Sequence, residues 1–193
     1  MLRIMKATHG LIFLEIAAYS TLSLANYPIF SYLGFSPIAF ERGQFWTLLT
    51  SLFVHINIIH LALNMVLLYI FGSALEEELG AVRTMTIFFV GGAGSLILGI
   101  PLLQFTTTVG SSSAVAAVAG GALLIKPDKT LPSVLFRAPV GLFATTYLVL
   151  NIVLAFYDQG GFIAYPSHII GFGLGLILAI SLKSRNHILR PTW

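Results

Sequence analysis

The feature that most constrains this chain is a series of apolar runs along its whole length. Of its 193 residues, 57% are hydrophobic and 9% are charged, whereas soluble domains usually carry about 25% charged residues. A bilayer core of about 30 Å needs roughly 20 apolar residues per helix. The runs therefore predict an all-α polytopic membrane protein. The chain has no cysteine, so disulfide and thiolate chemistry are excluded, and its net charge of +3 gives no indication of nucleic-acid binding.

The glycine and proline residues between the runs predict one compact bundle over residues 1–193, with six membrane-spanning helices. The expected spans cover residues 8–25, 57–75, 84–103, 112–126, 138–157 and 163–182. A long outer loop over residues 26–55 exceeds the usual loop length, and such loops tend to be functional or to carry structure of their own. The first run ends in Ser23 to Ala25, as a secretory signal does, but an uncleaved first span fits the charge pattern better.

The basic residues predict the orientation of the chain. With a cytoplasmic N-terminus, Arg42 is the one Lys or Arg on the outer side. The other nine fall on the cytoplasmic side: Arg3, Lys6, Arg83, Lys126, Lys129, Arg137, Lys183, Arg185 and Arg190. This asymmetry follows the positive-inside rule. We therefore expect both termini in the cytoplasm, and the connections over 26–55, 104–111 and 158–163 on the outer side.

Polar side chains inside the expected spans are costly and tend to mark function. In the second span, His60 and Asn64 are four residues apart and share one helix face. The sixth span carries His168 about one turn from its outer end, and the fourth opens with three serines in VGSSSAVAAV, residues 109–118. These groups are expected at a similar depth in the outer part of the membrane.

The serines suggest nucleophilic chemistry. A serine hydroxyl is a poor nucleophile unless a base lies within hydrogen-bonding reach, and the imidazole of His168 is the natural base because it titrates near neutrality. The alternative for Ser111 is a helix N-cap. Attack on a carbonyl also needs donors for the developing oxyanion, and His60, Asn64 and a free amide at the start of the fourth helix are suitable.

A serine–histidine pair on separate helices requires those helices to approach closely. Gly171 and Gly175 form a GxxxG face that shares its side of the helix with His168 and allows close approach. Small residues of the fourth span, among them Ala117 and Gly120, would receive it. The same glycines could instead support homodimerisation.

At these residues the chain resembles the rhomboid intramembrane serine proteases, of the prokaryotic six-transmembrane type. Three motifs stand in that family's order: HxxxxHxxxN (His55, His60, Asn64), GxSx (Gly110 to Ser113) and H-x-x-G-x-x-x-G (His168, Gly171, Gly175). The stretches GQFWTLLTSLFVH and EEELG also look like family segments. The resemblance extends from Gly43 to Ile180.

The resemblance implies roles for the polar residues. Ser112 would be the nucleophile and His168 the general base, in a dyad without an aspartate. His60, Asn64 and the amide of Ser112 would line the oxyanion hole. No metal or other cofactor is implied. The family also implies a gate near the fifth span and a cap loop after it.

A second set of residues is implied as supporting the site. His55 would contribute hydrogen bonding, and Glu76 would be a structural acid after the second span. Gly110 belongs to the serine motif, and Gly171 and Gly175 to the helix contact.

Three positions depart from the family pattern. Ser113 follows the expected nucleophile, where glycine is frequent. Ala116 stands where an aromatic ring often stacks on the histidine, and Thr47 follows Trp46 where many members have arginine.

The predicted function is an intramembrane serine endopeptidase. It would cleave single-span or polytopic membrane proteins near the outer face through an acyl-enzyme, within a prokaryotic cell membrane. Its oligomeric state is not predicted. Three alternatives stay open: a non-catalytic rhomboid-like protein that binds membrane clients, a small transporter or channel, and a metal site of His55, His60 and His168.

Overall fold

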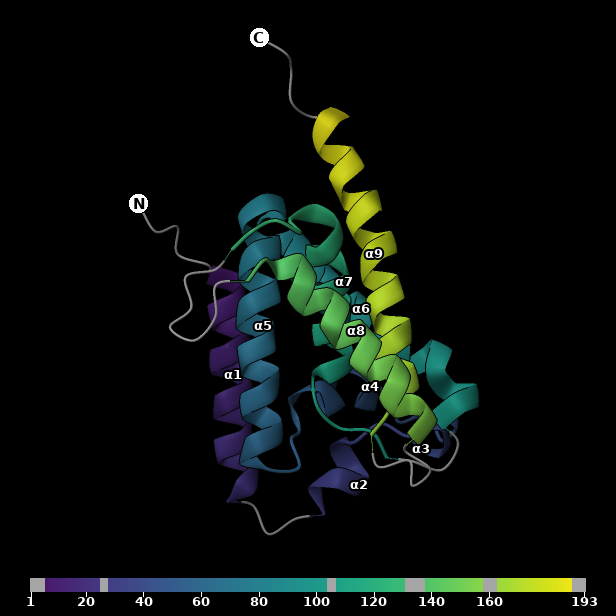
Figure 1. Cartoon of the computed structure of the whole chain (residues 1–193). Helices are drawn as coiled ribbons and strands as arrows, with labels where there is room; N and C mark the ends of the chain where they lie inside the picture. Colours follow the sequence, from purple (N-terminus) through teal and green to yellow (C-terminus); the bar gives the residue numbers. More distant parts are fainter. Residues whose placement is uncertain (1–5, 25–27, 104–106, 131–137, 158–162, 189–193) are drawn as a thin grey trace.

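The computed structural model is a bundle of helices (Figure 1). It describes residues 6–24, 28–103, 107–130, 138–157 and 163–188, with side chains described from residue 7 to residue 183. Within these ranges the pairing between extended segments is limited to two isolated antiparallel bridges, Phe35 with Thr108 and Thr130 with Pro139. Three of the basic residues used to predict the orientation lie outside the described residues: Arg3, Arg137 and Arg190.

Six helices, each of 14 or more residues, overlap the six ranges expected from the apolar runs. They are α1 (Lys6–Ser23), α5 (Ile58–Leu79), α6 (Ala81–Leu103), α7 (Ser112–Ile125), α8 (Val140–Tyr157) and α9 (Tyr165–Ile188). The loop predicted over residues 26–55 does carry structure of its own. It contains α2 (Ile29–Leu33), α3 (Pro37–Glu41), α4 (Thr47–Thr50) and the 3-10 helix η1 (Ser51–Phe53).

Helix α5 continues beyond residue 75, where we expected it to end. Its last turn contains Glu76, Glu77 and Glu78, and it stops at Gly80, whose φ of 81° no other residue type adopts easily. Glutamate favours helices, so the helix ends at the glycine and not at the first charge.

Four helices in the described ranges are long and apolar enough to cross a membrane. They are α5, α6, α8 and α9 over Tyr165–Lys183. Helix α7 is apolar but has only 14 residues. The chain is thus a polytopic helical membrane protein.

Helix α7 lies at the centre of the bundle. Every residue from Ser113 to Ala122 is buried. Its small side chains allow close contact with α6 and α9. A Cβ atom added at Gly91 of α6 would collide with Ala117, and one added at Gly120 would meet the carbonyl of Phe172 in α9.

The predicted GxxxG face of α9 packs against α7. A Cβ atom at Gly171 would meet the carbonyl oxygen of Ser113, and one at Gly175 would meet that of Ala117. The two backbones are therefore in direct contact, as small residues permit. His168 lies one turn before Gly171, so this contact brings it to the start of α7.

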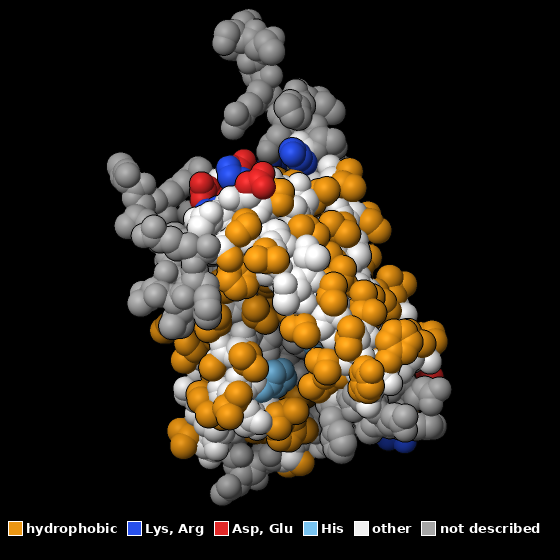
Figure 2. Space-filling model, viewed as in Figure 1, with side chains coloured by type: hydrophobic (Ala, Val, Ile, Leu, Met, Phe, Trp, Pro, Cys, Tyr) orange, Lys and Arg blue, Asp and Glu red, His pale blue; other side chains and the backbone are white. Residues whose placement is uncertain are grey.

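The two ends of the bundle differ. The start of α1 and the end of α9 lie at one end, and the short helices α2, α3 and α4 lie at the other (Figure 1). Figure 2 shows hydrophobic side chains over the sides of the molecule and charged side chains gathered mainly at the first end. Two ion pairs link α5 to the segment after α7, Lys126 with Glu78 and Lys129 with Glu77.

Glu76 connects α5 to α1. Its buried carboxylate accepts hydrogen bonds from the backbone amides of Ala7 (3.0 Å) and Thr8 (2.8 Å) and from the Thr8 hydroxyl (2.7 Å). The carboxylate thus supplies hydrogen-bond acceptors to amides in the first turn of α1, which have none within the helix. A negative charge is favourable there because the helix dipole is positive at this end. We expected this acid after the second span, and the structure places it within the last turns of that helix.

Candidate active site

The segment before α7 brings its first residues into a sharp turn. Gly110 has a φ of 105°, and its amide donates to the carbonyl of Ser51 at 2.8 Å. A Cβ atom at Gly110 would collide with the imidazole of His60. Glycine is therefore needed here for two reasons, the left-handed backbone and the close approach of His60.

Ser111 precedes α7 at the N-cap position, but its side chain makes no capping hydrogen bond. Its hydroxyl donates instead to Glu15 of α1, at 2.7 Å. Ser113 is buried, and its hydroxyl has no hydrogen-bond partner among the described residues. Of the three serines, Ser112 is the one whose hydroxyl contacts His168.

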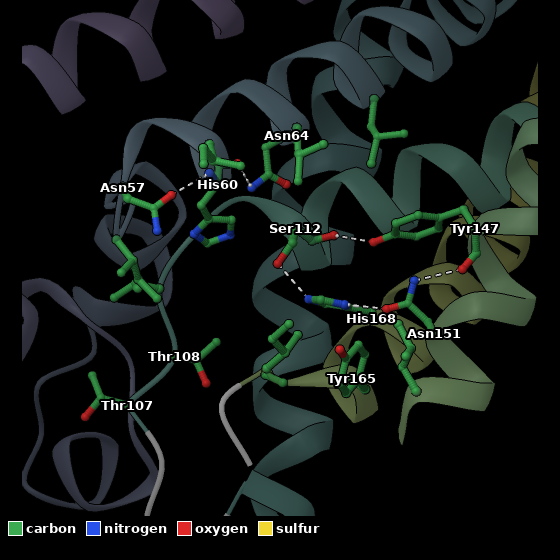
Figure 3. Close-up of a pocket in the computed structure, with 18 residues that line it drawn as sticks. Asn57, His60, Asn64, Thr107, Thr108, Ser112, Tyr147, Asn151, Tyr165 and His168 are labelled. Atoms are coloured by element: carbon green, nitrogen blue, oxygen red, sulfur yellow. Dashed lines mark hydrogen bonds between the residues drawn. The ribbon is translucent and has the colours of Figure 1, made fainter. Parts of the chain in front are cut away.

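Ser112 and His168 lie within hydrogen-bonding distance, with 2.6 Å between Oγ and Nε2 (Figure 3). The other ring nitrogen of His168, Nδ1, lies 2.6 Å from Oδ1 of Asn151. Asn151 donates its amide Nδ2 to the carbonyl of Tyr147 at 2.8 Å, so its oxygen faces the histidine. Nδ1 of His168 then carries the proton, and Nε2 is free to accept a hydrogen bond from the Ser112 hydroxyl.

Asn151 was missed by the sequence analysis, which expected a dyad. It lies in α8 four residues after Tyr147, and it is 6% exposed. The Tyr147 hydroxyl also donates to the carbonyl of Ser112 at 3.3 Å. A survey of every polar side chain in the apolar runs would have found this asparagine, since an amide is rare in such a helix.

The ring beside His168 comes from a position the sequence did not indicate. Ala116 is buried within α7, and the edge of Tyr165 contacts His168, with ring centroids 6.1 Å apart and planes at 80°. Tyr165 lies in the first turn of α9. The other departure, Thr47, is buried, and its hydroxyl donates to the carbonyl of Gln44 at 2.6 Å.

A cavity of about 490 Å³ opens at this site. Ser112, His168, His60 and Asn64 all line it. Figure 3 shows His60 and Asn64 on α5, facing Ser112 from the side opposite His168. Asn64 donates Nδ2 to the His60 carbonyl at 3.0 Å, and this amide nitrogen has a second proton. The amide of Ser112 is in the first turn of α7, where amides have no acceptor within the helix.

His55 lies behind His60 and away from the cavity lining. It is 4% exposed, and its ring contacts that of His60 with centroids 5.0 Å apart. Burial, together with the nearby His60, lowers the pKa of His55 to about 4. His55 is therefore neutral at pH 7. The resemblance implied a supporting role for His55, and its polar neighbours are the backbone of Phe53 and the carboxylate of Glu15, whose Oε2 lies 3.6 Å from Nε2.

The described residues contain no group of three or more histidine, aspartate or glutamate side chains arranged to hold a metal ion. The polar groups at the cavity are instead arranged around one hydroxyl. This geometry suits proton transfer and attack on a carbonyl.

Comparison with known proteins gives the family of this chain. The family model of the rhomboid domain matches residues 42–185. The chain is similar to RHOMBOID-like protein 6, mitochondrial, of Arabidopsis thaliana, with 38% identity over 83 residues, 43% of this chain and 27% of that protein. It is also similar to Rhomboid protease GluP of Bacillus subtilis (strain 168), with 26% identity over 115 residues, 60% of this chain and 22% of that protein.

A third relative is Inactive rhomboid protein 1 of Drosophila melanogaster, with 37% identity over 76 residues, 39% of this chain and 5% of that protein. The chain spans between 23% and 35% of the length of the first curated relatives it matches. The apolar helices define an integral membrane protein. With the family model covering most of its length, the chain belongs to the rhomboid family.

Proposed function

We propose that this rhomboid-family protein is an intramembrane serine endopeptidase with Ser112 as nucleophile and His168 as general base. One observation carries the proposal, the 2.6 Å contact between the Ser112 hydroxyl and Nε2 of His168. The neighbouring contact of Nδ1 with Asn151 supports it, because it leaves Nε2 unprotonated. Similarity to a rhomboid protease supports the same activity.

The first chemical step would form an acyl-enzyme. Nε2 of His168 takes the proton of the Ser112 hydroxyl as Oγ attacks the carbonyl carbon of the scissile peptide. The carbonyl oxygen becomes an oxyanion, for which the Ser112 amide, His60 and Asn64 are the available donors. The tetrahedral intermediate then collapses, and the imidazolium of His168 gives its proton to the leaving amine.

Hydrolysis would complete the reaction. A water molecule gives a proton to Nε2 of His168 and attacks the acyl carbon. The second tetrahedral intermediate releases Ser112 as the proton returns to its Oγ. Oδ1 of Asn151 accepts a hydrogen bond from Nδ1–H throughout and so stabilises the charged imidazolium in both halves of the reaction.

The lining of the cavity is suited to a membrane-protein substrate. Besides its polar groups, it presents apolar side chains from α5 and α8, among them Leu63, Leu67 and Leu154. A peptide carbonyl in an intact helix is hydrogen-bonded, so we expect cleavage near small or helix-destabilising residues of a transmembrane segment.

We further propose six spans, with α1 and α7 added to the four helices that meet the length and hydropathy criteria. The charge asymmetry supports cytoplasmic termini. The start of α1 and the end of α9 lie at the same end of the bundle, which agrees with this (Figure 1). The site then lies near the outer face. We propose a prokaryotic cell membrane as its location.

The test uses the full chain in proteoliposomes with a fluorogenic transmembrane reporter. We expect cleavage by the wild type, and none above background by Ser112→Ala or His168→Ala. Circular dichroism and the unfolding temperature of each variant establish that it is folded. Cleavage at the wild-type rate by folded Ser112→Ala would refute the assignment.

The alternative is a non-catalytic protein that binds membrane clients, and similarity to an inactive rhomboid protein favours it. A fluorophosphonate probe separates the two. The protease is labelled at Ser112, whereas the client-binding protein retains its client and is not labelled.

A further inference from the structure

Glu15 is a buried carboxyl group that the proposed mechanism does not use. It lies in the middle of α1, and its side chain is fully buried. An ionisable group within a membrane helix is costly and is retained where it has a specific partner. The partner of Glu15 lies 96 residues away along the chain.

That partner is Ser111, whose hydroxyl donates to Oε2 of Glu15 at 2.7 Å. Ser111 is fully buried and occupies the N-cap position of α7. Serine at this position usually bonds to the helix it precedes, but here its side chain reaches α1 instead. The bond therefore ties the start of α7 to a neighbouring helix.

Two further contacts place Glu15 behind the active site. Its Oε2 lies 3.6 Å from Nε2 of His55, and the ring of His55 packs edge to face on His60, with centroids 5.0 Å apart. His60 lines the cavity with Ser112. Glu15 thus contacts Ser111, which precedes the nucleophile, and His55, which packs against His60 on the other side of the cavity.

We propose that Glu15 is a positioning residue of the active site. Its carboxylate accepts a hydrogen bond from the Ser111 hydroxyl and so fixes the first turn of α7. The direction of the Ser112 hydroxyl and amide is fixed with that turn. This inference rests on the proposed function, since it assigns Glu15 to the same site. Glu15 itself does not contact the reacting atoms.

The test compares variants that differ in hydrogen-bond acceptance. Glu15→Gln keeps a carbonyl acceptor of the same length, and we expect nearly wild-type kcat. Glu15→Leu keeps an apolar side chain of similar volume without an acceptor. We expect its kcat to fall by about ten- to a hundred-fold with little change in KM, because small displacements of reacting groups have effects of this size. Ser111→Ala should lower kcat by a similar factor. The double variant with Ser111→Ala and Glu15→Leu should lower kcat no further than either single variant.

The matched control is Thr8→Val. It removes another buried side-chain hydrogen bond of the same helix, the one to Glu76, far along α1 from Glu15. We expect a lower unfolding temperature with unchanged kcat below the transition. An equal loss of kcat in Thr8→Val, or wild-type kcat in Glu15→Leu, would overturn the proposal.

A second measurement does not depend on activity. Amide hydrogen exchange of the peptide covering residues 110–115 should be faster in Glu15→Leu than in the wild type, and nearly unchanged in Glu15→Gln. Unchanged exchange in Glu15→Leu overturns the positioning role. If the wild type cleaves no substrate and is not labelled by fluorophosphonate, the proposed function fails, and exchange alone then decides whether Glu15 orders this turn.

Discussion

Asn151 and His168 are joined by a buried contact of 2.6 Å between Oδ1 and Nδ1. The two residues come from adjacent helices, α8 and α9, and the asparagine is itself fixed by the carbonyl of Tyr147. One tautomer of the histidine satisfies this arrangement, the tautomer in which Nε2 can accept a proton from Ser112. The proposed base therefore has an orienting group, which is an asparagine.

Removing this group should slow the chemical step. We expect Asn151→Ala to lower kcat by about ten- to a hundred-fold, because the imidazole can then rotate or adopt the other tautomer. Asn151→Asp retains an acceptor for Nδ1, so it should keep more activity than the alanine variant. Reporter cleavage over a range of substrate concentrations separates kcat from KM, and equal kcat in Asn151→Ala and the wild type would contradict this role.

The contact between α9 and α7 predicts a difference between two glycines of one helix. Gly175→Ala places a methyl group against the carbonyl of Ala117, whereas a Cβ at Gly173 meets nothing within 4 Å. We expect the first to lower stability by about 1–3 kcal/mol, as overpacking does, and Gly173→Ala to have little effect. Thermal or denaturant unfolding in one detergent gives the comparison. Equal stability of the two variants would show that the helices are not in backbone contact.

Gly110 and Gly43 separate backbone strain from displacement of His60. Both have positive φ, 105° and 81°, but a Cβ at Gly43 meets nothing within 4 Å, and one at Gly110 collides with the His60 ring. Each alanine variant should lose stability, by about 1–3 kcal/mol from the backbone alone. Only Gly110→Ala should also lower kcat. A similar loss of kcat in folded Gly43→Ala would argue against a specific role for His60.

His55 should make stability depend on pH. Burial lowers its pKa from 6.5 to about 4, so the unfolded chain binds a proton at this position more readily than the folded chain. The contribution of neutral His55 is fully present above pH 6.5 and is lost as the pH falls toward 4. We expect the unfolding temperature of the wild type to fall across this range more steeply than that of His55→Gln. Parallel curves would contradict the low pKa.

Much of the helix arrangement could be predicted because it depends on local features. Apolar runs indicated the long helices, and residues at helical spacing indicated which side chains share a face, as for His60 and Asn64. Helix ends were less accurate. The second span was expected to end at residue 75, but α5 continues to Leu79, directly before Gly80.

Except for the GxxxG face of α9 against α7, several contacts between helices could not be derived in this way. Asn151 carries no motif, and its partner lies on another helix. Glu15 meets a serine 96 residues away, so no local spacing indicates the pair. Tyr165 replaces the expected ring from a different helix. Such pairs depend on how the helices pack, and the spacing of residues within one helix does not specify them.

The short length of α7 sets how deep the reaction would take place. Its 14 residues extend about 21 Å at 1.5 Å per residue, roughly 9 Å less than a hydrocarbon core of about 30 Å. If the far end of a helix of this length reaches one boundary of the membrane, Ser112 at its start lies well below the opposite surface. The length of α7 would then fix the depth of Ser112 in the membrane. A protease with this site would select the peptide bond to cut by its distance from the membrane surface as well as by the residues around it.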